Sequence, residues 1–150
     1  MANRTFNAAK VEIMQGSHGF DNGGDAFGIV LCMTGNNIDA ASKVGTANDL
    51  TDLTMDEYDG AGYTRPTLGG QTVSSAADST SVFVDYTDVT FTTLASGSTS
   101  IAGVLLYESN SASANDSANK PIAYYDITDI NGNGGNLVFA FNSAGALTLA

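Results

Sequence analysis

The sequence predicts a mainly β protein: an antiparallel β-sandwich or barrel with one short N-terminal helix and a long acidic loop or arm. Charged residues make up only 14% of the chain and glycine is frequent, which suits short strands joined by turns better than a helical bundle with charged outer faces. Several β-branched and aromatic segments follow one another after residue 80. With 150 residues, 43% of them hydrophobic, the chain can bury one core, so residues 1–150 are expected to form a single domain.

The segment "TFNAAKVEIMQG" predicts the helix, over about residues 5–15. Phe6, Ala9, Ile13 and Met14 recur at spacings of three and four residues, which places them along one side of a helix. Asn3 or Thr5 can cap its start, and a glycine follows it at position 16.

The run "AFGIVLCMT" is apolar and of strand length, which predicts a central strand with Phe27, Ile29, Leu31 and Met33 on one face. In "GYTRPTLGG", the proline after Arg65 restricts that segment to an edge or an irregular path. The last two strands are expected at 137–141 and 146–149, separated by "NSAG", a connection of hairpin length. The stretch "SNSASANDSANK", 109–120, has no large apolar residue and predicts an exposed, mobile hairpin tip.

The charge balance limits the partners. A formal net charge of −11 opposes nucleic-acid binding, which depends on clustered lysine and arginine. No stretch approaches the ~20 apolar residues of a membrane span and the first residues do not resemble a signal peptide, so we expect synthesis in the host cytoplasm and no membrane partner.

Catalytic and metal-binding patterns are weak. Asp129 begins what reads as the front half of a calcium loop, but the twelfth position, which should close the cage with a carboxylate, is Ala140. The stretch is interpreted as a glycine-rich turn, with no metal and no cofactor required. Cys32, the only cysteine, lies in apolar company and is expected to be an inert core thiol, which disfavours a nucleophile pair with His18. Nothing singles out a catalytic carboxylate pair, so no catalytic residue is assigned and the protein is not expected to be an enzyme.

Three segments together resemble a family of small virion proteins of tailed bacteriophages. These are "FNAAKVEIMQGSHGFDNGGDAFGIVLCMT", the "EYDGAGYTRPTLGG" segment with Gly60, Gly62, Tyr63 and Thr64, and the closing part with "AGVLLYESN", "KPIAYYDI" and "NGNGGNLVFAFNSAGALTL". The resemblance is closest to capsid decoration, or cement, proteins. The acidic segment of about residues 35–57 has no firm equivalent in that family.

The resemblance implies a non-catalytic protein of the phage head surface that binds the major capsid protein and stabilises the shell. It also implies self-association on the capsid, a trimer being one form. Contacts with the shell are expected from the N-terminal helix region or from residues 35–57. Residues 35–57 carry four apolar residues in an otherwise polar stretch, and these could lie in grooves of the shell or cover the domain's own core: Ile38, Leu50, Leu53 and Met55. A tail, neck or fibre module of the same virion, and a glycan-binding or glycan-active β domain, remain as alternatives.

Overall fold

The protein is mainly β, with 38% strand and 14% helix. The computed structural model describes residues 3–17, 20, 25–75, 81–109, 115–142 and 145–149. Its largest sheet has the order β1-β7-β6-β2, all antiparallel. The strands of this sheet are β1 (Arg4–Thr5), β2 (Ala26–Met33), β6 (Ile101–Ser109) and β7 (Lys120–Ile130).

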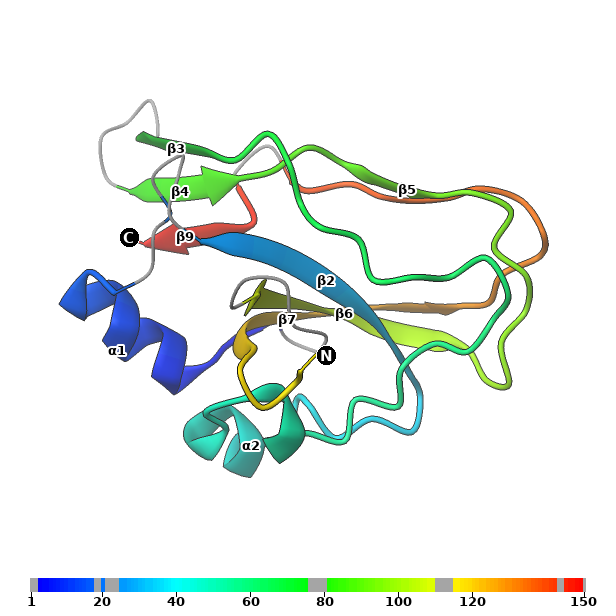
Figure 1. Ribbon diagram of the computed structural model, residues 1–150, viewed down its shortest axis with the longest axis horizontal. Coiled ribbons are helices and arrows are strands. Elements are labelled where there is room, and N and C mark those ends of the chain that lie inside the picture. Colours follow the sequence, from blue (N-terminus) through cyan, green and yellow to red (C-terminus); the bar gives the residue numbers. More distant parts are fainter. Residues whose placement is uncertain are drawn as a thin grey trace.

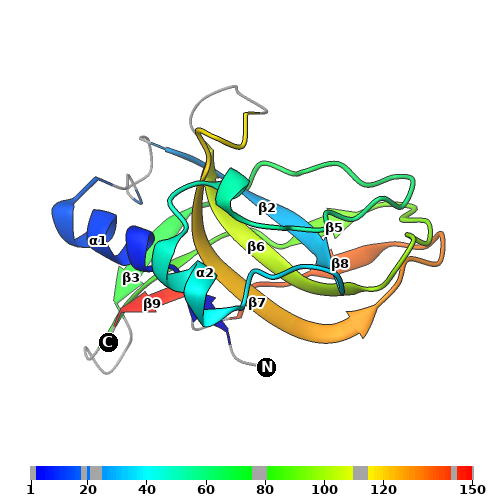
Figure 2. The same ribbon diagram turned by 90° about the horizontal axis from the view of Figure 1, so that it is seen from below.

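Two smaller antiparallel sheets complete the β structure. One has the order β3-β4-β9, from Thr72–Ser75, Val82–Asp85 and Leu147–Leu149; the other pairs β5 (Val89–Phe91) with β8 (Leu137–Phe139). In Figure 1 both smaller sheets lie along one side of β2, β6 and β7. Figure 2, seen from below, shows the face of the large sheet that is turned away from the smaller sheets. The sheets do not join into one closed barrel.

The predicted central strand is confirmed. From Phe27 to Met33 every residue of β2 is buried, which explains why the sequence there is continuously apolar rather than alternating. One edge of β2 pairs with β6, and residues 56–68 follow the other edge irregularly. Tyr58 N–H donates to Leu31 C=O at 2.9 Å and Leu68 N–H to Phe27 C=O at 2.7 Å, so the irregular path predicted around Pro66 is also confirmed.

The predicted N-terminal helix is confirmed as α1 (Asn7–Gln15). It ends at Gly16, whose left-handed backbone lets the Gly16 and Ser17 N–H groups donate to the carbonyls of Ile13 and Glu12. The prediction of a side-chain cap was wrong. The N-cap is Phe6, which offers no polar atom and instead has its ring in the core, while Thr5 lies in β1.

The prediction that α1 is the only helix was also wrong. A second helix, α2 (Ala41–Thr46), and the 3₁₀ turn η1 (Leu50–Asp52) lie within the segment that was expected to be a loop or arm. The side chain of Asp49 caps η1 by accepting from Thr51 N–H at 2.9 Å. No helix in the described ranges has the length and apolar character needed to cross a membrane.

Two expected hairpin features differ from the structure. Strands β8 and β9 do not pair with each other across "NSAG": β8 pairs with β5 and β9 with β4. The expected mobile tip at 109–120 is also wrong in its described part. There Leu50 N–H donates to the carbonyls of Asp116 at 3.1 Å and Asn119 at 3.0 Å, and Asn119 is buried. Residues 110–114 of that stretch lie outside the described residues.

Candidate functional site

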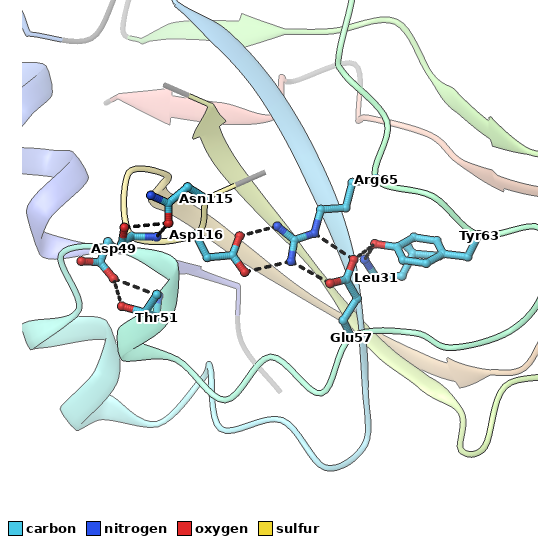
Figure 3. Close-up of polar contacts among 9 residues, drawn as sticks. Leu31, Asp49, Thr51, Glu57, Tyr63, Arg65, Asn115 and Asp116 are labelled. Atoms are coloured by element: carbon cyan, nitrogen blue, oxygen red, sulfur yellow. Dashed lines mark hydrogen bonds and ion pairs between the residues drawn. The ribbon is translucent and has the colours of Figure 1, made fainter. Parts of the chain in front are cut away.

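A three-residue ion cluster centred on Arg65 is the main polar site in the described part of the chain. The Arg65 guanidinium binds both oxygens of Glu57, through Nε at 2.8 Å and Nη2 at 2.7 Å. It also binds both oxygens of Asp116, through Nη1 and Nη2 (Figure 3). All three side chains are partly buried, with exposed fractions between 22% and 31%.

Each member of the cluster comes from a different part of the fold. Glu57 is bridged to Cys32 of β2, Arg65 belongs to the segment beside β2, and Asp116 lies in the connection from β6 to β7. Tyr63 extends the cluster: its hydroxyl donates to Glu57 Oε1 at 2.9 Å and accepts from Leu31 N–H at 3.2 Å. The cluster therefore joins β2, its neighbouring segment and the β6–β7 connection.

The electrostatics of the cluster favour its charged and hydrogen-bonded form. Bonding to Glu57 raises the pKa of Arg65 above its usual value, and burial raises the pKa of Tyr63. The Arg65 guanidinium also lies over the ring of Tyr107, 5.9 Å from its centroid. Its N–H groups point at carboxylates that use all four of their oxygens on it, so the site offers neither a free anion-binding guanidinium nor a free general base. We interpret it as a structural clamp.

The stretch that begins at Asp129 is a turn, as predicted. Strand β7 ends at Ile130 and β8 begins at Leu137, so no helix follows the loop. The Asn131 side chain, which would be a calcium ligand, instead accepts from the Tyr58 hydroxyl at 2.7 Å and from Gly97 N–H at 2.9 Å. The described residues contain no group of three or more His, Cys, Asp and Glu side chains placed to hold a metal ion.

Cys32 is a buried core thiol, as predicted. It has no exposed surface, and burial raises its pKa, which keeps it protonated and unreactive. His18, the other half of the nucleophile pair that the sequence disfavoured, lies outside the described residues.

The four apolar residues proposed to contact a shell lie within this domain's own core. Ile38 and Leu50 are fully buried, Leu53 is 8% exposed, and Met55 is partly buried against the same cluster. The sequence left two interpretations open for these residues, contact with the shell and cover of the domain's own core. Their burial supports the second. The sequence did not reveal this, because their spacing fits no regular helix or strand: Leu50 begins the short turn η1 and is held by the β6–β7 connection.

The outward side of α1 carries the most exposed apolar side chain in the described chain. Met14 is 89% exposed and Val11, three residues earlier and so on the same side of the helix, is 51% exposed. The sequence grouped Met14 with Phe6, Ala9 and Ile13 by its spacing, but Met14 does not share their burial. The buried residues of this segment are Phe6 and Ala9, with Ile13 partly buried beside Val73 and Val82. Val11 and Met14 therefore place two exposed apolar side chains on one side of α1.

Sequence reasoning also missed the Arg65 clamp. The available signal was an arginine in a chain with few basic residues, within a segment of turns and aromatic residues, where a partly buried guanidinium requires carboxylate partners. Asp116 could not have been chosen, because it comes from the low-complexity stretch expected to be mobile.

Comparison with protein-family models, with curated proteins and with solved structures found no match.

Proposed function

We propose that the protein is a capsid decoration, or cement, protein of a tailed bacteriophage, which binds the outer surface of the head and stabilises the shell without catalysis. The observation that carries the proposal is the exposed apolar surface of α1, on a domain in which the Arg65 cluster, the main polar site of the described residues, is already saturated within the chain. The resemblance of three segments to small virion proteins supports it. We also propose that the sheets of this domain pack as a β-sandwich.

The contact with the shell is assigned to α1 rather than to the 35–57 segment. Met14 and Val11 can lose their exposed surface only by binding another molecule, and each buried apolar side chain contributes up to ~1.5–3 kcal/mol. Methionine adapts its shape to irregular grooves, which suits a seam between shell subunits. Ile38 and Leu50 could reach a partner only if the domain opened.

The partner is the major capsid protein, with self-association on the capsid, as a trimer for example, adding contacts between copies. A net charge of −11 keeps free copies apart in solution and directs them away from packaged nucleic acid. On the shell, the lattice holds many copies in place, so contacts of even ~1 kcal/mol act together against opening of the seams.

The test compares particles made with and without the protein. Particles without it should package DNA but rupture at a lower temperature than complete particles, and added purified protein should restore their resistance. Equally stable heads that fail to adsorb to the host would replace this proposal with the tail, neck or fibre module. A glycan-binding domain is indicated if the purified protein binds host-surface polysaccharide and leaves shell stability unchanged.

A further inference from the structure

The turn between β7 and β8 contains two asparagine-glycine pairs, at 131–132 and at 133–134. An asparagine that is followed by glycine can lose its side-chain amide without an enzyme. Glycine has no Cβ to keep the next backbone nitrogen away from the asparagine carboxamide. Asn131 and Asn133 are both exposed, so solvent water reaches them. A third pair, at 22–23, lies outside the described residues.

Each of the two glycines has a structural reason. A Cβ at Gly132 would overlap the carbonyl oxygens of Leu94 and Ala95, so the turn passes too close to that backbone for any side chain. Gly134 has open space around it, but its φ of +84° is left-handed, and other residues adopt such a conformation only at a cost. The fold therefore requires glycine after both asparagines, and the chemical reactivity of the pairs comes with it.

The side chain of Asn131 points across to another segment of the chain. Its Oδ1 lies 2.7 Å from the Tyr58 hydroxyl and accepts from Gly97 N–H at 2.9 Å, while its Nδ2 donates to Gly97 C=O at 3.5 Å. Gly132 N–H, which carries the nitrogen that would have to attack, donates to the Tyr58 hydroxyl at 2.9 Å. Contacts outside the turn therefore hold both the carboxamide and the nitrogen in place.

The side chain of Asn133 instead folds forward over the residues that follow it. Its Oδ1 accepts from Gly135 N–H at 2.9 Å, and this Asx turn holds the carboxamide against the intervening peptide unit of Gly134. One contact opposes the reaction. Gly134 N–H donates to Leu94 C=O at 2.8 Å, and that bond must break before the nitrogen can lose its proton.

We propose that Asn133 is a self-modification site, where deamidation produces aspartate and isoaspartate, and that the Tyr58 hydroxyl protects Asn131 from the same reaction. The Gly134 nitrogen gives its proton to solvent base and bonds to Cγ of Asn133, and the Cγ–Nδ2 bond breaks to release ammonia. Water then opens the succinimide ring, at Cγ to give isoaspartate's counterpart aspartate, or at the main-chain carbonyl to give isoaspartate. Water is consumed and ammonia released, and no oxidant or reductant takes part. The inference is independent of the function proposed above.

Isoaspartate at this position would disturb the attachment of the turn. It lengthens the main chain, whereas Gly134 N–H and Gly135 C=O bond to the C=O and N–H of the same residue, Leu94, at 2.8 and 2.9 Å. Leu94 is fully buried, so the turn is fixed to the core at this point. Isoaspartate should therefore lower the melting temperature. Asn133→Asp keeps the main chain and the acceptor oxygen, and should melt close to the wild-type protein.

The test incubates the purified protein at mildly alkaline pH, where base removes the nitrogen's proton most readily. Tandem mass spectrometry of its peptides follows each asparagine, and the urea-unfolded chain is the reference. Asn133 should react more slowly in the folded protein than in the unfolded chain. It should still react at least about tenfold faster than Asn131, because each hydrogen bond that must open slows the reaction by up to about tenfold.

Two variants test the protection of Asn131. Tyr58→Phe removes the hydroxyl and should bring the rate at Asn131 to within a few-fold of the rate at Asn133. Arg65→Lys is the matched control: it weakens a different cluster but keeps every Tyr58 contact, so Asn131 should stay slow. Equal rates at the two asparagines in the folded wild-type protein, or faster reaction at Asn131, would overturn the proposal. So would a rate at Asn131 that Tyr58→Phe leaves unchanged, or that Arg65→Lys raises equally.

Discussion

The Tyr58 hydroxyl lies 2.7 Å from Oδ1 of Asn131. This contact holds the segment beside β2 against the turn after β7, although the two are far apart in the sequence. The same oxygen lies 2.8 Å from Ala95 C=O and accepts from Gly97 N–H at 2.8 Å and Gly132 N–H at 2.9 Å. One phenol oxygen therefore joins the turn before β6 to the turn after β7.

Tyr58→Phe should destabilise the protein by about 1–3 kcal/mol. The ring would keep its buried position, but two backbone N–H groups and the Asn131 side chain would lose a partner. Urea unfolding followed by far-ultraviolet circular dichroism measures the change. A loss below about 0.5 kcal/mol would show that water replaces the hydroxyl at no cost.

Arg65→Lys should destabilise the protein by about 1–3 kcal/mol although it conserves the charge. Lysine cannot bind Glu57 and Asp116 through paired N–H groups as the guanidinium does. Arg4→Lys is the matched control: Arg4 is exposed in β1, and its replacement should change stability by less than about 0.5 kcal/mol. Equal effects of the two substitutions in urea unfolding would contradict the clamp.

Stability should fall at alkaline pH. Burial raises the pKa of Tyr124 from 10.0 to about 12, and burial raises the pKa of Tyr63, Tyr86 and Tyr125 in the same direction. Because the folded pKa lies above the unfolded one, the contribution of Tyr124 is complete below pH 10. It is lost as the pH rises to about 12, by about 2–3 kcal/mol.

Urea midpoints at pH 9 and pH 11, together with tyrosinate absorbance at equilibrium, check the alkaline prediction. Tyr124→Phe should reduce the difference between the two midpoints. Unchanged midpoints for the wild-type protein would contradict it.

Gly103→Ala should destabilise the protein by about 2 kcal/mol or more, because a methyl group there would overlap the phenol ring of Tyr124 on the neighbouring strand. Gly69→Ala is the control, since nothing lies within 4 Å of a methyl group at that position. Thermal unfolding of both variants should separate them clearly. If Gly103→Ala and Gly69→Ala have the same melting temperature, the close approach of β6 and β7 at this point is wrong.

Met14→Gln should leave the domain intact and weaken its attachment to phage heads. The side chain is 89% exposed, so stability should change by less than about 0.5 kcal/mol, whereas an apolar contact with a shell would be lost. Co-sedimentation of the purified variant with depleted heads measures attachment. Thr72→Gln, on exposed β3, is the control. Normal attachment of Met14→Gln would move the shell contact away from α1.

The elements that sequence reasoning predicted correctly depend on local patterns. The glycine at position 16 and the apolar spacing before it were enough for α1, and a continuous apolar run was enough for β2. The pairing of β8 with β5 and of β9 with β4 could not be predicted, because "NSAG" satisfies the local criteria for a hairpin equally well. The Arg65 site depends on Asp116, whose position is decided by packing between distant segments.

The pairing of Thr5 with Ala123 and of Leu50 with Asn119 has a consequence for how the chain is made. During synthesis, the first strand and η1 leave the ribosome long before the residues that bind them. The N-terminal half must therefore wait with Phe6, Ile38 and Leu50 uncovered, and the core can close only after β7 has emerged. Folding is consequently expected to be a late, nearly all-or-none event, and a ribosome stalled before residue 120 should hold a protease-sensitive chain.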